Sequence, residues 1–147
     1  MASSMQGALS ATNARSVISC AGASAVLQSA QAKAAEIGVP VVVAVVDDAG
    51  DLVAFSRGDG TPRGAAQWAI DKAVTASSFR APTHVLAQGM AGAPLAAVAS
   101  FIAQPHVTLV PAGIPLVVEG SFVGAVGASG GSPEQDLEIA EAGAAAL

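Results

Sequence analysis

VVVAVVDDAGDLVAFSRGDGTPRGAAQWAIDKAVTASSFRAPT, residues 41–83, is the stretch that decides the fold. It begins with an apolar run, Val41–Val46, followed by a turn cluster at Asp47–Gly50 and a second apolar run at Leu52–Phe55. β-Branched and aromatic residues favour strands, and a glycine in a short connection supplies the backbone conformation that a hairpin needs. We therefore predict a β-hairpin. Because its first strand is apolar on both faces, both faces of the sheet should be covered.

A helix is predicted directly after this hairpin. Thr61 is suited to cap it, and Pro62 is suited to its first position because proline lacks an N–H that would have no partner there. The helix should continue to Ser78, with Asp71 and Lys72 in mid-helix, where we expect both to be solvated. Its inner side should carry alanines at helical spacing, namely Ala65, Ala66, Ala69, Ala73 and Ala76.

The remaining chain predicts helices before and after this unit and a second hairpin. An Ala-rich helix should open between Leu9 and Thr12 and stop at Gly38. Later elements are two short helices (85–90 and 94–102), a strand entry (107–110), two strands (114–118 and 122–129) joined at Glu119-Gly120, and a helix (133–147). Ser132 and Gln135 form a capping-box pattern, in which first-turn acids such as Glu134 and Asp136 are explained by the helix dipole. The order predicts a largely antiparallel sheet flanked by helices.

Composition limits the class of protein. The 147 residues fit one domain, and we assign residues 1–8 to a disordered tail and 9–147 to a single domain. Apolar residues make up 52% and charged residues only 12%, against about 25% charged in typical domains, so we expect part of the surface to face another subunit. The net charge of −5 argues against nucleic-acid or anionic-membrane partners, and no apolar run approaches a membrane span. The single cysteine agrees with a cytoplasmic location.

Two glycine-rich loops, each leading from a strand into a helix, are the main candidates for ligand binding. They are residues 55–62 and 128–133, and the second contains Gly130 and Gly131. Free N–H groups at such places attract carboxylates or phosphates, although the glycines could equally serve only the turns. Arg57 and Arg80 could clamp a carboxylate together, or each could pair with neighbouring groups instead.

Three other side chains are candidates for chemistry. His106, at the predicted strand entry, is the better acid/base or metal candidate of the two histidines, although a lone histidine is more often structural. Asp59 could move a proton in place of His106, and Trp68 could stack on a ligand or pack against another subunit. No metal site is predicted, because one cysteine and two histidines show no ligand spacing.

Three segments, Val43–Gly60, Asp71–Thr83 and Gly113–Asp136, resemble the GlcG/HbpS-like family of haem-binding and haem-degrading proteins, which includes the C-terminal domain of PduO corrinoid adenosyltransferases. The resemblance implies a profilin-like α/β/α sandwich of the α+β type around a five-stranded antiparallel sheet. It also implies homo-oligomers from dimers to octamers, and haem as a cofactor. The family's haem-binding members are expected to carry an iron-ligating histidine on the first helix, which is absent from Thr12 to Ile37, so that Cys20 or a methionine would have to replace it.

Two classes of function follow from these patterns. The first is an oligomeric binding protein for a small anionic or planar ligand near Arg57, Arg80 and the glycine loops. The second is a cofactor-independent isomerase, hydratase or lyase acting on a small carbonyl or carboxylic acid, in which an arginine anchors the substrate and His106 or Asp59 moves a proton. The two classes differ in whether a titratable group and an arginine open into one dry pocket.

Overall fold

The central strand β1 (Val42–Asp47) organises a four-stranded antiparallel sheet in the computed structural model, which describes residues 9–147. The strand order is β2-β1-β4-β3, where β2 is Leu52–Arg57, β3 is Gly113–Val118 and β4 is Ser121–Ser129. The helices are α1 (Cys20–Ile37), α2 (Ala65–Phe79), α3 (Thr83–Gly89), α4 (Leu95–Ile102) and α5 (Pro133–Ala144). The predicted tail at residues 1–8 lies outside the described part of the chain.

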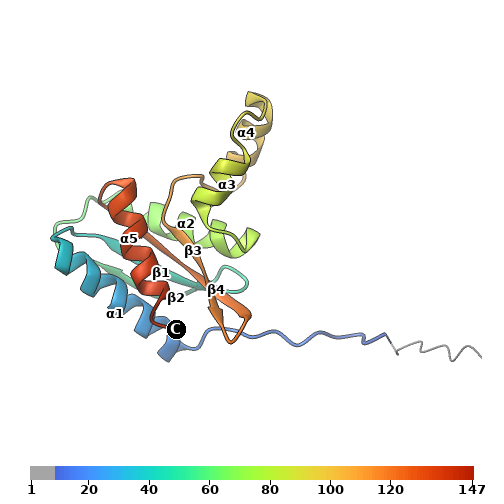
Figure 1. The fold of residues 1–147 in the computed structure, drawn as a ribbon, viewed down its shortest axis with the longest axis horizontal. Coiled ribbons are helices and arrows are strands. Elements are labelled where there is room, and N and C mark those ends of the chain that lie inside the picture. The colour runs from blue at the N-terminus through green and yellow to red at the C-terminus, as the bar shows by residue number, and fades with distance from the viewer. Residues whose placement is uncertain (1–8) are drawn as a thin grey trace, which may run out of the picture.

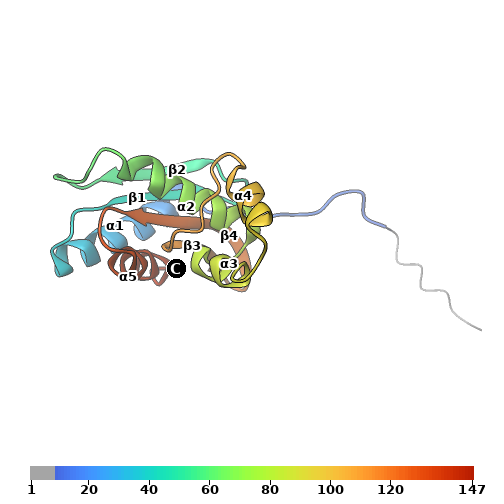
Figure 2. The same ribbon diagram turned by 90° about the horizontal axis from the view of Figure 1, so that it is seen from above.

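The sheet is covered on both faces, as the apolar first strand predicted. In Figure 2, α2 lies on one side of the sheet, and α1 and α5 lie on the other. Alternate residues of β1 divide between these sides: Val43 and Val45 join the core shared with α1 and α5, whereas Val42 and Ala44 pack on alanines of α2. Burial of every side chain of β1 except that of Asp47 explains its continuous apolar sequence.

The sheet has four strands and not the five that the family resemblance implied. Residues 107–110, predicted as a strand entry, form no strand because side chains take their backbone donors. The N–H of Thr108 donates to the hydroxyl of Thr75 at 3.0 Å, and the N–H of Val110 donates to the hydroxyl of Thr108 at 3.1 Å. A segment bonded in this way has no free donors at these positions for a sheet ladder.

Two predicted helix starts are wrong for the same kind of reason. The first helix begins at Cys20, capped by Ser19, because the N–H of Ile18 is bonded to the carbonyl of Val123 at 3.1 Å. The second begins at Ala65, because the Thr61 hydroxyl donates to the carbonyl of Gly58 and caps no helix. In both cases a hydrogen bond to a distant or preceding backbone group replaces the expected cap.

The second hairpin and the last helix agree with the prediction. Glu119 and Gly120 both have positive φ, 50° and 79°, as a two-residue type I′ turn requires. Ser132 and Gln135 form the capping box at the start of α5. None of the helices within residues 9–147 combines the length and apolar character needed to cross a membrane.

Close packing of α2 on the sheet depends on glycine. A Cβ atom on Gly127 of β4 would overlap the carbonyl oxygen of Ala69, and one on Gly113 of β3 would overlap that of Lys72. The glycines therefore let the backbone of α2 approach β3 and β4 directly. The pair α3 and α4 instead extends away from the sheet, as Figure 1 shows, and no residue of α4 is buried.

Candidate functional site

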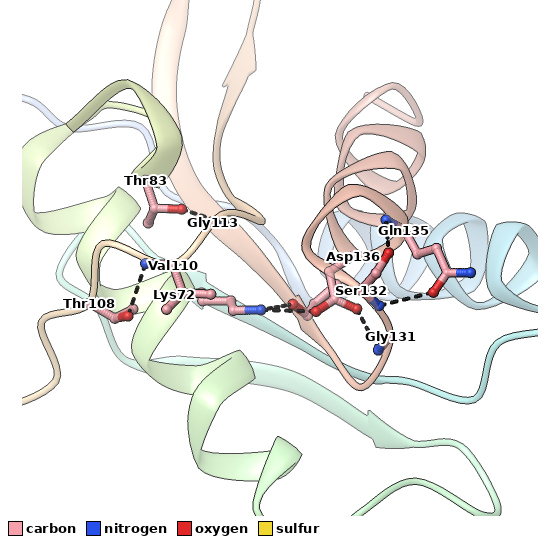
Figure 3. Close-up of polar contacts among 10 residues, drawn as sticks. Lys72, Thr83, Thr108, Val110, Gly113, Gly131, Ser132, Gln135 and Asp136 are labelled. Atoms are coloured by element: carbon pink, nitrogen blue, oxygen red, sulfur yellow. Dashed lines mark hydrogen bonds and ion pairs between the residues drawn. The ribbon is translucent and has the colours of Figure 1, made fainter. Parts of the chain in front are cut away.

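A buried ion pair links α2 to the start of α5. Lys72 and Asp136 are 1% and 3% exposed, and the Lys72 Nζ lies 3.1 Å from the Asp136 Oδ2. Lys72 also donates to the carbonyl of Ala128 at 2.8 Å, while the Gly131 N–H donates to the Asp136 Oδ1 at 2.8 Å. Figure 3 shows the lysine reaching from α2 to the loop that leads into α5. The expectation that Lys72 is solvated is wrong, as is the expectation that dipole stabilisation fully explains Asp136.

Burial changes the acid–base behaviour of Lys72. Loss of water lowers the pKa of its ammonium group, and the attraction of Asp136 only partly opposes this change. The charged form is therefore less favourable here than in water, despite its partner. A lysine in such surroundings is available as a neutral amine at lower pH than an exposed lysine.

Two adjoining cavities meet at Trp68, whose side chain on α2 is 48% exposed. The larger, of about 660 Å³, has mostly apolar walls: besides Trp68 and Asp71, it is lined by Ile102, residues 107–111 and Pro133. The smaller, of about 210 Å³, is lined by Lys72, Ser129, Gly131 and Asp136. Trp68, Val110 and Pro133 line both cavities, so we describe them together as the Trp68 groove.

A histidine–carboxylate pair lies beside the Trp68 groove. The His106 Nδ1 is 2.8 Å from the Asp71 Oδ1, and Gln67 donates to the same oxygen at 2.8 Å. With the Nδ1 proton directed to Asp71, the Nε2 of His106 presents a lone pair. His106 has a positive φ of 60°, and the Thr75 hydroxyl donates to its carbonyl at 3.0 Å. Within the described residues, Arg80, Ala112 and Glu119 are the other non-glycine residues with positive φ.

The other predicted site residues lie elsewhere in the fold. Arg57 pairs with Val42 at one end of β1, where Gly130 and Thr61 bring the two glycine loops side by side. Asp59 lines a separate cavity near Gly38.

Arg80 lies toward the opposite end of the sheet, with its guanidinium carbon 4.9 Å from the ring centre of Phe122. It lines a polar cavity there with Arg15 and Asp48. Arg57 pairs with the first residue of β1, whereas Arg80 shares its cavity with Asp48, which follows Asp47, the last residue of β1. The two ends of β1 are roughly 16 Å apart. The structure therefore does not bring Arg57 and Arg80 into one clamp. It does bring Trp68 and Gly131 to one groove, with His106 beside it.

Sequence reasoning missed Lys72, Asp71 and Asp136 as members of the site. For Lys72 a signal was present: it lies three residues after Ala69 and four before Ala76, and so belongs to the inner face of α2. No group of three His, Cys, Asp or Glu side chains within residues 9–147 could hold a metal ion.

Comparison with known proteins shows a match over nearly the whole described chain. The family described as "Haem degrading protein HbpS-like" matches residues 18–145. A 15.0 kDa protein encoded between dhaT and dhaS in Citrobacter freundii is 36% identical over 125 residues, 84% of this chain and 87% of that protein.

Two solved structures share the fold. Protein ORFY of Klebsiella pneumoniae has a TM-score of 0.86 at 27% identity, covering 94% of this chain and 95% of that one. The haem complex of PduOC has a TM-score of 0.81 at 32% identity, covering 89% and 95%.

Proposed function

This chain belongs to the HbpS-like family, and from that premise we propose that it binds a small, planar, anionic ligand in the Trp68 groove. The observation that carries the proposal is the half-exposed indole of Trp68, which lines both the apolar cavity and the cavity that ends at Lys72. Apolar walls with a few polar groups at one end are typical of small-molecule sites. The haem complex of PduOC supports a planar ligand class for the fold.

The two ends of the groove suit the two parts of such a ligand. A flat apolar body would stack on Trp68 and contact Val107, Leu109 and Pro111. An acidic group would lie toward Lys72, whose ammonium has three N–H donors and two protein acceptors, Asp136 and the carbonyl of Ala128. We predicted that the amide of Gly131 would donate to a ligand, but its N–H donates to Asp136. In this arrangement Gly131 would make only van der Waals contact with a ligand.

Haem fits this groove through His106. The family's implied helix histidine is missing, and Cys20 lies at the exposed start of α1. His106 has the arrangement usual for a metal-ligating imidazole, because a carboxylate holds its Nδ1 and leaves its Nε2 free. When bound, haem would supply iron-centred redox chemistry. In that complex His106 would hold the iron and Trp68 would contact the macrocycle.

A porphyrin titration tests this proposal, with Trp68, the sole tryptophan, as the fluorescent probe. Haemin and iron-free protoporphyrin IX should both quench its emission. When binding is followed by porphyrin absorbance, Trp68→Leu should weaken the affinity for both porphyrins by about two- to tenfold, since an aromatic contact contributes about 0.5–1.5 kcal/mol beyond its area. His106→Ala should weaken only haemin and change its Soret band, and His84→Ala is the matched control. The absence of quenching by either porphyrin, or equal affinity of the Trp68 variant, would contradict the proposal.

We also propose that the chain forms a homo-oligomer, from dimer to octamer. Helix α4 consists of apolar residues apart from Ser100, and its Leu95 is 83% exposed. The ring centres of Phe79 and Phe101 lie 5.0 Å apart at the base of this arm. Light scattering on the full chain should give a mass above that of one protomer, and Leu95→Glu should reduce it. A monomer at every concentration would exclude this part of the proposal.

The pair of His106 and Asp71 favours a second candidate, a cofactor-independent isomerase, hydratase or lyase acting on a small carbonyl or carboxylic acid. An imidazole oriented by a carboxylate accepts protons efficiently. In this reading His106 is the base, and Lys72 takes the anchoring role first assigned to an arginine. Deuterium exchange into pyruvate would test it: exchange should depend on the protein, disappear with His106→Ala and persist with His84→Ala. Equal exchange by both variants would rule His106 out.

A further inference from the structure

The Lys72 end of the Trp68 groove can hold more than an anion. We propose that Lys72 is a nucleophile that forms a Schiff base with small aldehydes entering beside Trp68, with Asp136 as the counterion of the resulting iminium. The inference concerns covalent capture, and it holds whether or not the groove also takes a planar ligand. It rests on the cavity at Lys72, the position of Asp136 and the environment of the amine.

The first step of the argument is the cavity itself. Lys72 and Asp136 line a space of about 210 Å³ together with Trp68 and Ser129. The side chain of Lys72 is only 2% exposed, so bulk water has little access to it. A small carbonyl compound fits that volume beside the indole, and exclusion of water protects an imine from hydrolysis.

The second step is the bonding of the amine. The Lys72 Nζ donates to two protein acceptors within the described chain, the carbonyl of Ala128 at 2.8 Å and Asp136 at 3.1 Å. An ammonium has three donors, so one position on the nitrogen is not used by these contacts. A neutral amine that keeps one of these bonds has a lone pair for attack on a carbonyl carbon.

The third step is charge. Burial lowers the pKa of the Lys72 ammonium, which raises the share of neutral amine near neutral pH. Lys33, the other lysine, has its pKa raised by the hydrogen bond to Glu138 and by Glu36, and its side chain is 25% exposed. The pKa values of the two lysines are therefore shifted in opposite directions, and the lowered pKa makes Lys72 the more reactive amine.

The chemistry balances with groups already present. The ammonium first gives a proton to water or Asp136. The Nζ lone pair then forms a C–N bond with the aldehyde carbon, the C=O π electrons move to oxygen, and the oxygen takes up a proton. The nitrogen of this adduct loses a proton to give the neutral carbinolamine. The hydroxyl then takes back the proton first given to water or Asp136 and leaves as water, and the nitrogen lone pair forms the C=N bond of the iminium. The positive charge then lies where the ammonium charge lay, beside the carboxylate of Asp136, so the buried pair keeps its net charge.

Reductive trapping with acetaldehyde and sodium cyanoborohydride tests the proposal on the intact, folded chain. Each trapped imine adds one ethyl group to a lysine, and peptide mapping assigns it to Lys72 or Lys33. We expect Lys72 to be ethylated severalfold faster than Lys33, because the lowered pKa of Lys72 and the raised pKa of Lys33 give Lys72 the larger fraction of neutral amine. Ethylation of Lys33 and the N-terminus with Lys72 unlabelled would overturn the proposal.

Two controls make the assignment secure. In urea both lysines are exposed and should react at similar rates, so a Lys72 preference that survives unfolding would also overturn the proposal. Lys33→Arg should leave the fast ethylation intact, and Lys72→Arg, checked for native circular dichroism, should abolish it. Since the wild-type map needs no variant to fold, the test stands even if Lys72→Arg does not. Porphyrin titration is independent of this measurement, so failure of one proposal is distinguishable from failure of the other.

Discussion

Replacing Lys72 by methionine should be among the most destabilising single changes in this protein. The substitution keeps the apolar stem of the side chain but leaves the carboxylate of Asp136, 3% exposed, without its cation. Removing one partner of a buried pair typically costs about 3–5 kcal/mol.

The double variant Lys72→Met with Asp136→Leu separates a broken pair from lost packing. Because burial lowers the pKa of Lys72 in spite of Asp136, the cost of removing the charge from water exceeds the attraction. Removing both charges should therefore restore most of the stability. A residual loss of about 1 kcal/mol should remain, since the N–H of Gly131 loses its acceptor.

Urea unfolding followed by circular dichroism measures these differences. Lys72→Met alone should also lower the melting temperature by roughly 6–20 °C, at about 2–4 °C per kcal/mol for a chain of this size. Lys33→Met is the control and should change the midpoint little, because the partners of this partly exposed lysine, Glu36 and Glu138, are both solvent-exposed. A loss below about 1 kcal/mol for Lys72→Met would refute the buried pair. A double variant no more stable than the single one would refute the sign of the desolvation argument.

Three further changes test the packing, the cap and the turn, each by the same urea assay. Gly127→Ala should lower the free energy of unfolding by about 1–3 kcal/mol or more, because its Cβ would overlap the backbone carbonyl of Ala69. An unchanged urea midpoint would show that α2 packs less closely on β4. Ser132→Ala should cost about 1 kcal/mol by removing the cap of α5, and Ser132→Gly should recover most of it. Glu119→Asn should stabilise the second hairpin by up to about 1 kcal/mol, because asparagine tolerates its φ of 50° better; a loss of stability would contradict the type I′ turn.

Much of the architecture was predictable from short-range patterns. The apolar run of β1, the turn glycines and the capping box at Ser132 each act within a few residues, so the sequence alone indicates both hairpins and the last helix. The resemblance to the GlcG/HbpS-like family, carried by three such segments, is confirmed by the family match. Two of the errors, the start of α1 and the missing strand, occurred where a distant group bonds a local N–H, as the hydroxyl of Thr75 does for Thr108 and so leaves the sheet with four strands.

For the candidate site as well, some features follow from the sequence and others only from the tertiary structure. By itself the sequence determined the residue types: one indole at Trp68, two histidines, two lysines and glycines where loops enter helices. Only the tertiary structure decided which of them meet, placing Lys72 against Asp136, 64 residues away, and His106 against Asp71, while separating Arg57 from Arg80. The physical reason is that helix caps and tight turns act between neighbouring residues, whereas burial, charge pairing and hydrogen bonds between distant segments depend on how helices pack across the sheet. The chemistry of a lysine therefore follows from the position that the fold gives it.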